Sequence, residues 1–480
     1  MGWGNVLAAW SAVVRQYPHF DPLISKTDAE GVATDPKRVA EHKFYPFLKY
    51  DDRWTRFAPK GAKGKVKSRP IRFAARLDAC VFSYYRTKLS ARYEAWLSAA
   101  GLEGEVLAYR RIPKKNGGGK SNIEFAKEAF DTVRAYGSCC VVALDISDFF
   151  ENLDHGVLQR RWAALLDAKL LPADHFQVFK ALTRYAYVDV KKAYERLGYF
   201  GLKTRPDGSK VEGYLRAKKD IPKQLCDGRT FRSKITGDGA DPSIIVVNKT
   251  GKGVPQGAPL SDLLANLYMF EFDKAVSDRM ESLGGTYMRY SDDILLIAPV
   301  NVAEGEKLEE WVRKSIATYA PGLDIKEEKS SLHLVEPDGS DQRVSAILPS
   351  GKPNKNLEYL GFKYDGKHIL IRDKTMSSLY RKVAANCRAI AHSFAKRYQG
   401  KSTAEIMSMA NVEKLIQAFG PVRDFETKSD DYRKWTFSTY VKRASKVMGP
   451  LGNPISRQTR RLRSVIRQRL EADLLDIVGH

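Results

Sequence analysis

Two neighbouring aspartates, Asp292 and Asp293, are the residues of this sequence whose type and spacing are best suited to chemistry. They follow Tyr290 and Ser291 in the segment TYMRYSDDILLIA, with apolar and aromatic residues on both sides of the acids. This pattern predicts a β-hairpin with buried strands and the two carboxylates at its tip. Two adjacent carboxylates between buried strands need a counter-charge, so we expect divalent cations beside them. An ordinary solvent-exposed turn is the alternative.

A third acid, Asp145, ends the apolar run VVALD, which predicts a second buried strand. Three carboxylates around one point suit two-metal phosphoryl transfer, in which one Mg²⁺ activates a 3′-hydroxyl and the other neutralises the departing pyrophosphate. We therefore expect Asp145, Asp292 and Asp293 to be catalytic and to bind two Mg²⁺ ions, with Mn²⁺ as a substitute. Asp148 comes three residues after Asp145, and we expect it to take a secondary place beside the nucleotide.

A glycine-rich loop lies between the two acid motifs. In the segment KGVPQGAPLSDLL, Gly253, Pro255 and Gly257 predict a loop that leads into an amphipathic helix. Such a loop lets the backbone approach a flat ligand, and Gln256 is placed to reach a nucleotide from it. Taken alone, the segment is only a turn and a helix start, but its position between the acids makes it informative.

The motifs LDISDFF, GVPQG, YSDD, KEEKS and EYLGF follow one another in the order of the palm motifs of reverse transcriptases. The resemblance covers roughly residues 60–370. Upstream segments, such as VLAYR at 106–110 and NIEFAKEAF at 122–130, resemble most the bacterial reverse transcriptases of the abortive-infection and defence-associated groups. These groups are related to retron and group II intron enzymes.

This resemblance implies an α+β right-hand polymerase, with fingers, a palm built on an antiparallel sheet, and an all-helical, thumb-like C-terminal domain. We expect the N-terminal region and fingers at 1–136, the first palm strand at 137–159, fingers or an insertion at 160–252, the rest of the palm at 253–372, and the helical domain at 373–480.

The resemblance also implies the function. We expect an RNA-directed DNA polymerase that makes cDNA from deoxynucleoside triphosphates, using a cognate structured non-coding RNA as template, in bacterial defence against phage. A template-independent and protein-primed DNA polymerase of the abortive-infection type is the alternative. A catalytically inactive RNA-binding scaffold is a third hypothesis, which the intact acids and Gln256 disfavour.

Residues upstream of Asp145 hold the triphosphate in this family, and the candidates here are basic. Arg72 has the best defined direction, because it lies in a strand-like stretch after Pro70. The other candidates are Lys65, Lys67 and Arg69, and of these we expect Lys65 to contact the nucleotide.

An aromatic side chain lies against the incoming sugar in reverse transcriptases, and Phe150 occupies that position here. A phenyl ring leaves no room for a 2′-hydroxyl, so deoxynucleotides would be preferred. The neighbouring Phe149 is also assigned to the nucleotide site, although we expect one of the two rings to be core.

Lys329, after the acid hairpin, corresponds by resemblance to a residue near the departing pyrophosphate that donates a proton. Lys326 competes for this role. The resemblance places the primer and template against Tyr290 and against a second hairpin that contains Leu360, Gly361 and Phe362.

Strand signals end near residue 372, and helical periodicity continues to the C-terminus. A last helix is expected at 456–477, with Leu462, Ile466, Leu470 and Leu474 along one stripe. Four arginines lie off this stripe and are expected to contact phosphates of the primer and template: Arg457, Arg460, Arg461 and Arg467. The alternative is a solvated surface, with nucleic acid gripped through residues 374–396.

Composition agrees with a polyanionic partner. Lysine and arginine number 80 against 57 acids, a formal net charge of +23, which favours RNA and DNA as partners. No apolar run is long enough to cross a membrane, and the five cysteines show no metal-binding spacing, so we expect a cytoplasmic protein without a membrane partner. Irregular structure is expected at 27–36. The sequence allows a homo-oligomer but does not predict one.

Overall fold

The computed structural model describes residues 10–55, 64, 66–115, 117–205, 208–239, 241–325, 327, 330–347, 356–420 and 436–479. The chain forms two compact units, each assembled from segments that are distant in sequence. The first unit comprises Met1–Tyr109, Ile146–Val276 and Arg313–Ile325, and the second comprises Arg110–Asp145, Ser277–Val312 and Lys326–His480. The expected domain boundaries at 136, 159, 252 and 372 stay predictions.

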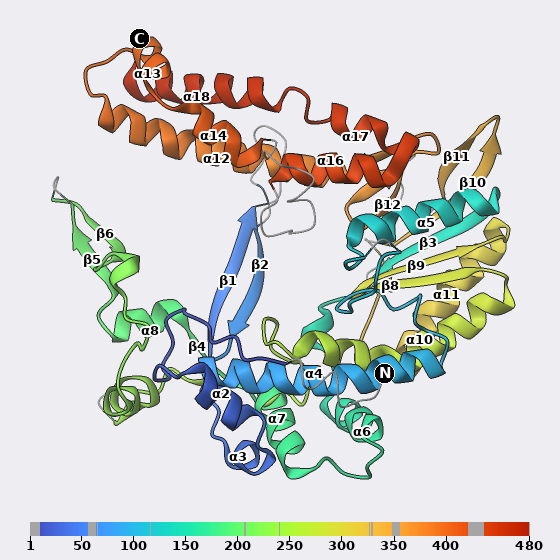
Figure 1. The fold of residues 1–480 in the computed structure, drawn as a ribbon, viewed down its shortest axis with the longest axis horizontal. Coiled ribbons are helices and arrows are strands. Elements are labelled where there is room, and N and C mark those ends of the chain that lie inside the picture. Colours follow the sequence, from blue (N-terminus) through green and yellow to red (C-terminus); the bar gives the residue numbers. More distant parts are fainter. Residues whose placement is uncertain are drawn as a thin grey trace. The chain divides into compact units, whose positions relative to one another are not determined.

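A four-stranded sheet of order β2-β1-β4-β7 and several helices make up the first unit (Figure 1). Strands β1 and β2 form a long antiparallel ribbon, and β4 pairs parallel with β1. The strands of this sheet are β1 (Phe47–Thr55), β2 (Val66–Phe73), β4 (Ala186–Asp189) and β7 (Val246–Val247). A separate two-stranded sheet contains β5 (Phe200–Thr204) and β6 (Lys210–Tyr214).

The main helices of the first unit are α2 (Lys26–Ala33), α3 (Pro36–Glu41), α4 (Arg76–Ala99), α6 (His155–Leu165), α7 (Ala173–Thr183) and α8 (Val190–Arg196). Shorter turns of helix are η1 (Phe149–Glu151), η2 (Lys218–Asp220), α9 (Gly228–Thr230) and the π-helix η3 (Phe231–Gly237). Helices α10 (Ser261–Ser282) and α11 (Val302–Tyr319) include residues of both units.

The expectation of irregular structure at 27–36 is wrong, because two capped helices occupy this segment. The side chain of Ser25 accepts a hydrogen bond from the backbone of Asp28 at the start of α2. The carboxylate of Asp35 does the same for the first turn of α3, where Pro36 occupies the position that suits its missing N–H.

A five-stranded sheet of order β11-β10-β3-β9-β8 organises the second unit, and every neighbouring pair in it is antiparallel. Its central strand, β3, is apolar along nearly its whole length and almost completely buried, since strands run along both of its edges. The strands are β3 (Cys139–Asp145), β8 (Thr286–Tyr290), β9 (Asp293–Ala298), β10 (Ser331–Asp338) and β11 (Asp341–Ile347). This sheet confirms the expected α+β fold with an antiparallel palm sheet.

A smaller sheet of the same unit contains β12 (Leu357–Tyr359), β13 (Phe362–Tyr364) and β14 (Ile369–Ile371), and helix α5 (Asn122–Tyr136) also belongs to this unit. Helix α5 begins with a capping box, in which Ser121 and Glu124 each bond the other's backbone N–H.

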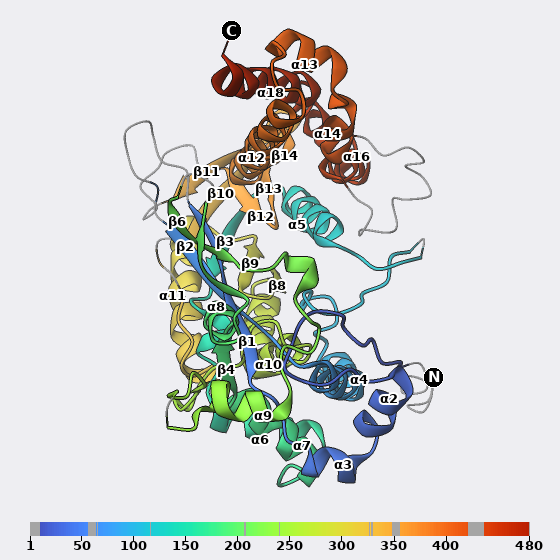
Figure 2. The same ribbon diagram turned by 90° about the vertical axis from the view of Figure 1, so that its left-hand side faces the viewer.

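Beyond β14, all the elements in the described part of the chain are helical, which confirms the helical C-terminal region (Figures 1 and 2). They are α12 (Asp373–Arg397), α13 (Thr403–Met409), α14 (Val412–Phe419), α16 (Phe437–Met448), η6 (Gly449–Gly452), α17 (Asn453–Arg457) and α18 (Leu462–Val478).

The single last helix expected at 456–477 is wrong, because the chain breaks between α17 and α18. Gln458 explains the break: its side-chain amide accepts a hydrogen bond from the backbone N–H of Ile371 and donates one to the carbonyl of the same residue, both at 2.9 Å. The predicted apolar stripe is nevertheless confirmed, since its four members on α18 are no more than 5% exposed.

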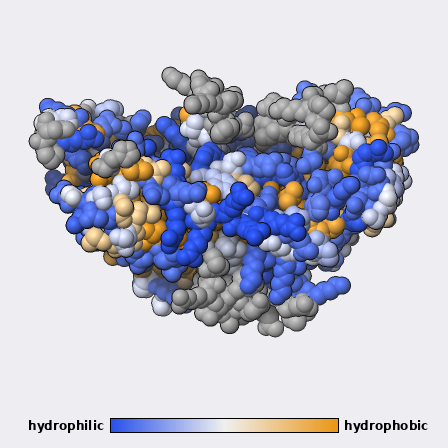
Figure 3. All heavy atoms as spheres, turned by 90° about the horizontal axis from the view of Figure 1, so that it is seen from above, coloured by the Kyte–Doolittle hydropathy of each residue, from blue (hydrophilic) through white to orange (hydrophobic). Residues whose placement is uncertain are grey.

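Among the described residues, no helix is long and apolar enough to span a bilayer. In the space-filling view, hydrophilic residues cover most of the described surface that faces the viewer, and apolar residues form smaller separate groups (Figure 3). All five cysteines are unpaired, and four of them are buried.

Candidate active site

The acid pair lies where the sequence predicts it, at the tip of the β8–β9 hairpin of the second unit. Tyr290 pairs with Asp293 across the two strands, so Ser291 and Asp292 form a two-residue turn. Ser291 has a φ of 61°, a left-handed conformation that tight hairpin turns require. The turn therefore places two consecutive carboxylates at one edge of the central sheet.

Strand pairing brings Asp145 opposite one of these two acids. In the antiparallel ladder between β3 and β9, Asp145 is directly opposite Asp293. Residues opposite each other in such a ladder have Cβ atoms about 4.5–5.5 Å apart, and like charges in that arrangement repel. Oxygen ligands suit Mg²⁺ and Mn²⁺, and a bound cation would offset the repulsion, so the pair fits the expected metal.

Within the described part of the chain, no group of three or more His, Cys, Asp and Glu side chains lies close enough to form a metal-binding cluster. The strand register places two of the three expected carboxylates, Asp145 and Asp293, opposite each other, and the third does not complete a cluster with them. Asp292, one residue before Asp293, is half-buried in the turn.

A buried arginine next to the turn of the acid hairpin was not among the residues predicted for the site. Arg289 on β8 is completely buried, and its Nη1 donates a hydrogen bond of 3.0 Å to the carbonyl oxygen of Ser291 in the turn. A buried guanidinium is costly unless its N–H groups are hydrogen-bonded, and the Ser291 carbonyl accepts one such bond. The signal in the sequence is a lone arginine within a strand that is otherwise aromatic and apolar.

Two tyrosines lie close to Asp293. Burial, followed by the charge of Asp293, raises the pKa of Tyr290, whose ring centroid is 6.1 Å from that of Phe125. Burial also raises the pKa of Tyr359, with further contributions from Asp293 and Tyr290. Among the described residues, the Tyr359 hydroxyl is buried without a hydrogen-bond partner. Both phenols therefore stay protonated at neutral pH.

The second predicted hairpin is present, with Leu360 and Gly361 at its tip between β12 and β13. Both tip residues have positive φ, 45° and 95°. The carbonyl of Leu360 accepts a hydrogen bond of 3.0 Å from Asn122, and the carbonyl of Gly361 accepts one of 3.0 Å from the backbone of Arg372. Phe362 is completely buried and supports the hairpin from beneath, whereas Leu360 and Gly361 at the tip are half-buried, and their contact with a primer stays a prediction.

The glycine loop belongs to the first unit, where its backbone packs against other backbone. A Cβ on Gly253 would lie 2.7 Å from the carbonyl oxygen of Glu151, and one on Gly257 would lie 2.6 Å from that of Arg72. The loop also accepts a hydrogen bond of 2.9 Å from the Arg72 N–H to the Gln256 carbonyl. Packing within the protein therefore requires glycine at both positions, and the approach of this loop to a nucleotide stays a prediction.

Arg72 lies on β2, as predicted, but its side chain is only 7% exposed. Its guanidinium forms two hydrogen bonds with Glu151, at 2.7 and 3.4 Å. The same group lies over the rings of Tyr185 and Tyr187, 5.1 and 5.3 Å from their centroids. Arg72 is thus rigidly oriented, and its role toward a triphosphate stays a prediction. Two other predicted residues, Lys65 and Lys329, lie outside the described residues, as does Lys326.

The two phenylalanines after Asp145 differ in burial. Phe149 is 4% exposed, whereas Phe150 is half-buried, with its ring 5.5 Å from that of Phe149 and 6.3 Å from that of Tyr109. The expectation that one ring is core is therefore confirmed, although both residues lie in the short helix η1 rather than in a strand. Asp148, just before this helix, is exposed and has a left-handed φ of 41°.

The four predicted C-terminal arginines fall into two groups. Arg457, Arg460 and Arg461 are exposed around the break between α17 and α18. Arg467 is exposed too, but it forms an ion pair of 2.9 Å with Glu413, which also pairs with Arg463 at 2.5 Å. The exposed arginines of the first group therefore fit the prediction of phosphate binding better than Arg467, whose charge is partly neutralised by Glu413.

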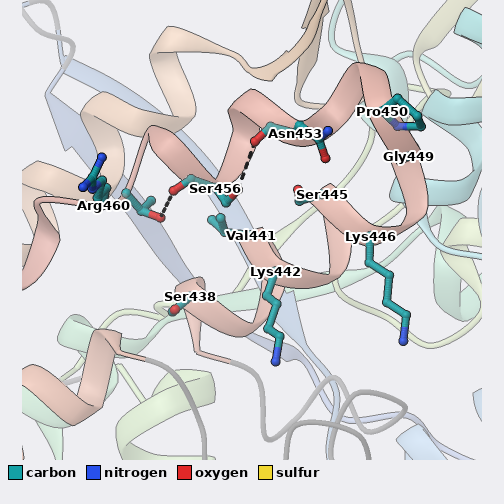
Figure 4. A pocket seen from close by; sticks show the side chains of 11 residues that line it. Ser438, Val441, Lys442, Ser445, Lys446, Gly449, Pro450, Asn453, Ser456 and Arg460 are labelled. Carbon is teal, nitrogen blue, oxygen red and sulfur yellow. Dashed lines mark hydrogen bonds between the residues drawn. The ribbon is translucent and has the colours of Figure 1, made fainter.

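A cavity of about 670 Å³ lies between α16 and the η6–α17 segment. Lys442 and Lys446 extend from α16 on one side, and Arg460 and Ser456 line the other (Figure 4). Ser456 donates its hydroxyl proton to the carbonyl of Asn453, at 3.0 Å. The cavity is thus lined by cations and hydroxyl groups next to the predicted arginines.

Comparison with known proteins identifies part of the chain. Residues 242–364, which include the glycine loop and both hairpins, match the family described as reverse transcriptase (RNA-dependent DNA polymerase). The chain thus carries a reverse transcriptase domain. A search of curated proteins found no match.

Among solved structures, the chain is similar to telomerases at 10% identity. One is apo telomerase from Candida tropicalis truncated from its C-terminal domain, with a TM-score of 0.36, covering 77% of this chain and 65% of that one. Another is telomerase from Candida albicans in complex with a TWJ fragment of telomeric RNA, with a TM-score of 0.33, covering 93% of this chain and 66% of that one. The chain thus spans slightly less than two thirds of each.

Proposed function

We propose that this protein is an RNA-directed DNA polymerase whose Asp145, Asp292 and Asp293 bind two divalent cations. The observation that supports this most is the register that places Asp145 opposite Asp293 at the tip of the acid hairpin. This acid hairpin lies within the region that matches the reverse transcriptase family. An antiparallel pair of carboxylates at the end of buried strands has no evident structural use, because like charges destabilise the ladder.

When bound, the two metal ions supply Lewis-acid activation of the primer 3′-hydroxyl and neutralisation of the departing pyrophosphate. The chain's own residues hold and orient these groups. Arg289 holds the turn through Ser291, so that the two carboxylates keep a constant direction. Phe150 excludes a 2′-hydroxyl, and Arg72 and Gln256 contact the nucleotide. Lys329 donates a proton to the pyrophosphate.

The proposed partners are deoxynucleoside triphosphates, a DNA product and a structured non-coding RNA that serves as template. The net charge of +23 supports polyanionic partners. We further propose, from the resemblance of the motifs to defence-associated enzymes, that the protein acts in the cytoplasm of a bacterium against phage.

The direct test is to incubate the purified full chain with Mg²⁺, the four deoxynucleoside triphosphates and RNA copurified from its host, and to sequence both product and RNA. A DNA product that matches the RNA supports the proposal. The matched control is the Asp292→Ala plus Asp293→Ala variant. We expect it to lose incorporation while it keeps RNA binding, because the acids bind metal and the basic surface binds phosphate.

Three results would count against the proposal. A random or homopolymeric product, particularly one covalently attached to the protein on a denaturing gel, would favour the template-independent and protein-primed alternative. No incorporation by the wild-type chain would favour the RNA-binding scaffold. Equal incorporation by the double variant would overturn the assignment of the whole site.

A further inference from the structure

The β5–β6 hairpin of the first unit is a two-stranded sheet of its own, which none of the palm motifs explains. It is antiparallel, with Phe200 opposite Tyr214 at its base and Thr204 opposite Lys210 near its turn. Figure 1 shows the two strands extending away from α8. An isolated two-stranded hairpin is marginally stable in water, so its base must be anchored.

The anchor lies on the face that contacts α8. The rings of Phe200 and Tyr214 meet edge to face, 5.4 Å apart, and pack against the buried cluster of the first unit. Lys191 on α8 lies over the Phe200 ring and forms an ion pair of 2.7 Å with Glu212. The acid on the hairpin's strands is therefore already neutralised by a residue outside it.

The opposite face of the hairpin is flat near its base. Gly201 and Gly213 are directly opposite each other, so no side chain rises from either strand there. The side chain of Lys203 lies over Gly213, 2.9 Å from where a Cβ would be, and Leu215 lies over Gly201 at 3.4 Å. The hairpin thus presents an aliphatic surface bordered by a cation, and Leu215 is 47% exposed.

Six cations on or just after this hairpin are exposed, and none forms an ion pair with a described residue. Two of them instead lie over aromatic rings: Arg216 over Tyr199 at 5.7 Å and Lys218 over Tyr214 at 4.8 Å. Other exposed lysines of the chain, such as Lys26 and Lys401, pair with an acid four residues later. The six are Lys203, Arg205, Lys210, Arg216, Lys218 and Lys219.

We propose that the β5–β6 hairpin is an RNA-binding arm, which grips the sugar–phosphate backbone of single-stranded RNA away from the palm acids. This inference rests on the proposed function, because it identifies RNA as the polyanion. Lys203 and Arg205 point to the same face about 7 Å apart, a spacing at which they meet neighbouring phosphates of an extended strand. The aliphatic surface between them and Leu215 is flat and apolar, so it accepts the face of a base.

The test is the binding of poly(U) by the full chain, measured as a function of salt concentration. The test variant carries Lys203→Gln and Arg205→Gln. The matched control carries Lys26→Gln and Lys401→Gln, which removes the same charge from lysines paired with Glu30 and Glu405.

We expect the test variant to flatten the slope of log affinity against log salt by up to about 1.4, since each of the two phosphate contacts on a single strand contributes about 0.7. The control should keep the wild-type slope. Equal slopes in the two variants, with both folded by circular dichroism, would overturn the inference. It would also fail if poly-L-glutamate displaced poly(U) as well as poly(A) does, because the hairpin would then be a site for any polyanion.

This result is separable from that of the polymerase assay. The binding experiment needs no incorporation, and it is repeated in the Asp292→Ala plus Asp293→Ala background. Should that background show the same difference between test and control variants while the wild type makes no DNA, the arm stands and the proposed function fails.

Discussion

At the scale of single residues, the candidate site holds two carboxylates opposite each other and a buried arginine near the same turn. The ladder brings Asp145 against Asp293, which is unfavourable for two like charges, and Arg289 lies buried behind the same turn. A positive charge on the inner side and a metal on the outer side would both reduce the repulsion between the carboxylates. Arg289 is therefore a positioning residue for the acids, since its hydrogen bond holds the turn and its charge lies behind it.

Replacing Arg289 tests this role. Arg289→Met should lower kcat and raise the Mg²⁺ concentration needed for half-maximal incorporation, because the Ser291 carbonyl loses its donor and the acids lose a counter-charge. Arg289→Lys should recover part of both, since it restores the charge. The measurement is an Mg²⁺ titration of incorporation at saturating nucleotide. A rise in the nucleotide KM alone, with metal dependence unchanged, would contradict this role.

Phe150 and Phe149 provide a matched pair for sugar selection. Phe150→Ala should raise incorporation of ribonucleotides relative to deoxynucleotides, because the half-buried ring is the one available to a substrate. Phe149→Ala removes the side chain of a residue that is 4% exposed and should lower the free energy of unfolding by about 3–5 kcal/mol. It should not change the ratio of ribonucleotide to deoxynucleotide incorporation. The ratio is measured with single nucleotides in competition. Unchanged discrimination in an active Phe150→Ala variant would place the gate elsewhere.

At the scale of elements, some arginines of the C-terminal helices form ion pairs, and others are exposed near the break between α17 and α18. The α18 arginines Arg463 and Arg467 share Glu413, and Arg469 pairs with Asp473. Around the break before α18, by contrast, Arg457 and Arg460 are exposed, and Arg460 lines the cavity beside α16. The break itself exists because Gln458 is bound to the backbone of β14.

This division predicts different salt dependence for two sets of substitutions. Arg457→Gln, Arg460→Gln and Arg461→Gln together should flatten the salt slope for duplex binding by up to about 2.7, at about 0.9 for each phosphate contact. Arg463→Gln plus Arg467→Gln should change it less, because Glu413 already neutralises part of their charge. The measurement is titration of an RNA–DNA duplex at several salt concentrations. A greater effect from the second set would show that this division is wrong.

At the scale of the whole molecule, binding and chemistry have separate origins. The net charge of +23 is spread over many exposed lysines and arginines, whereas the carboxylates of the candidate site are concentrated at one sheet edge. The proposed function therefore predicts that nucleic acid binds without metal, whereas phosphoryl transfer requires it.

Removing metal should separate the two activities. With excess EDTA at constant ionic strength, incorporation should fall to background, while the affinity for poly(U) changes less than twofold. Restoring Mg²⁺ or Mn²⁺ should restore incorporation. Retention of incorporation in EDTA would contradict the metal role of the acids, and loss of poly(U) binding would mean that metal also supports the nucleic-acid surface.

The sequence by itself determined the local features of this protein. It located the acid hairpin, the strand that ends at Asp145, the second hairpin at Leu360 and Gly361, and the apolar stripe of α18. Each depends on residues close together in the chain, because alternation, turn geometry and helical periodicity are properties of neighbours. It failed at 27–36, where side-chain caps of Ser25 and Asp35 outweighed turn-forming composition.

Only the tertiary structure decided which distant residues meet. The pairing of Asp145 with Asp293, of Arg72 with Glu151 and of Arg467 with Glu413 joins segments that no local pattern connects. The physical reason is that strand register and side-chain packing are set by the combined burial of many residues. One residue of slip along β3 would turn Asp145 to the other face of the sheet, and no part of the local sequence around it excludes that slip.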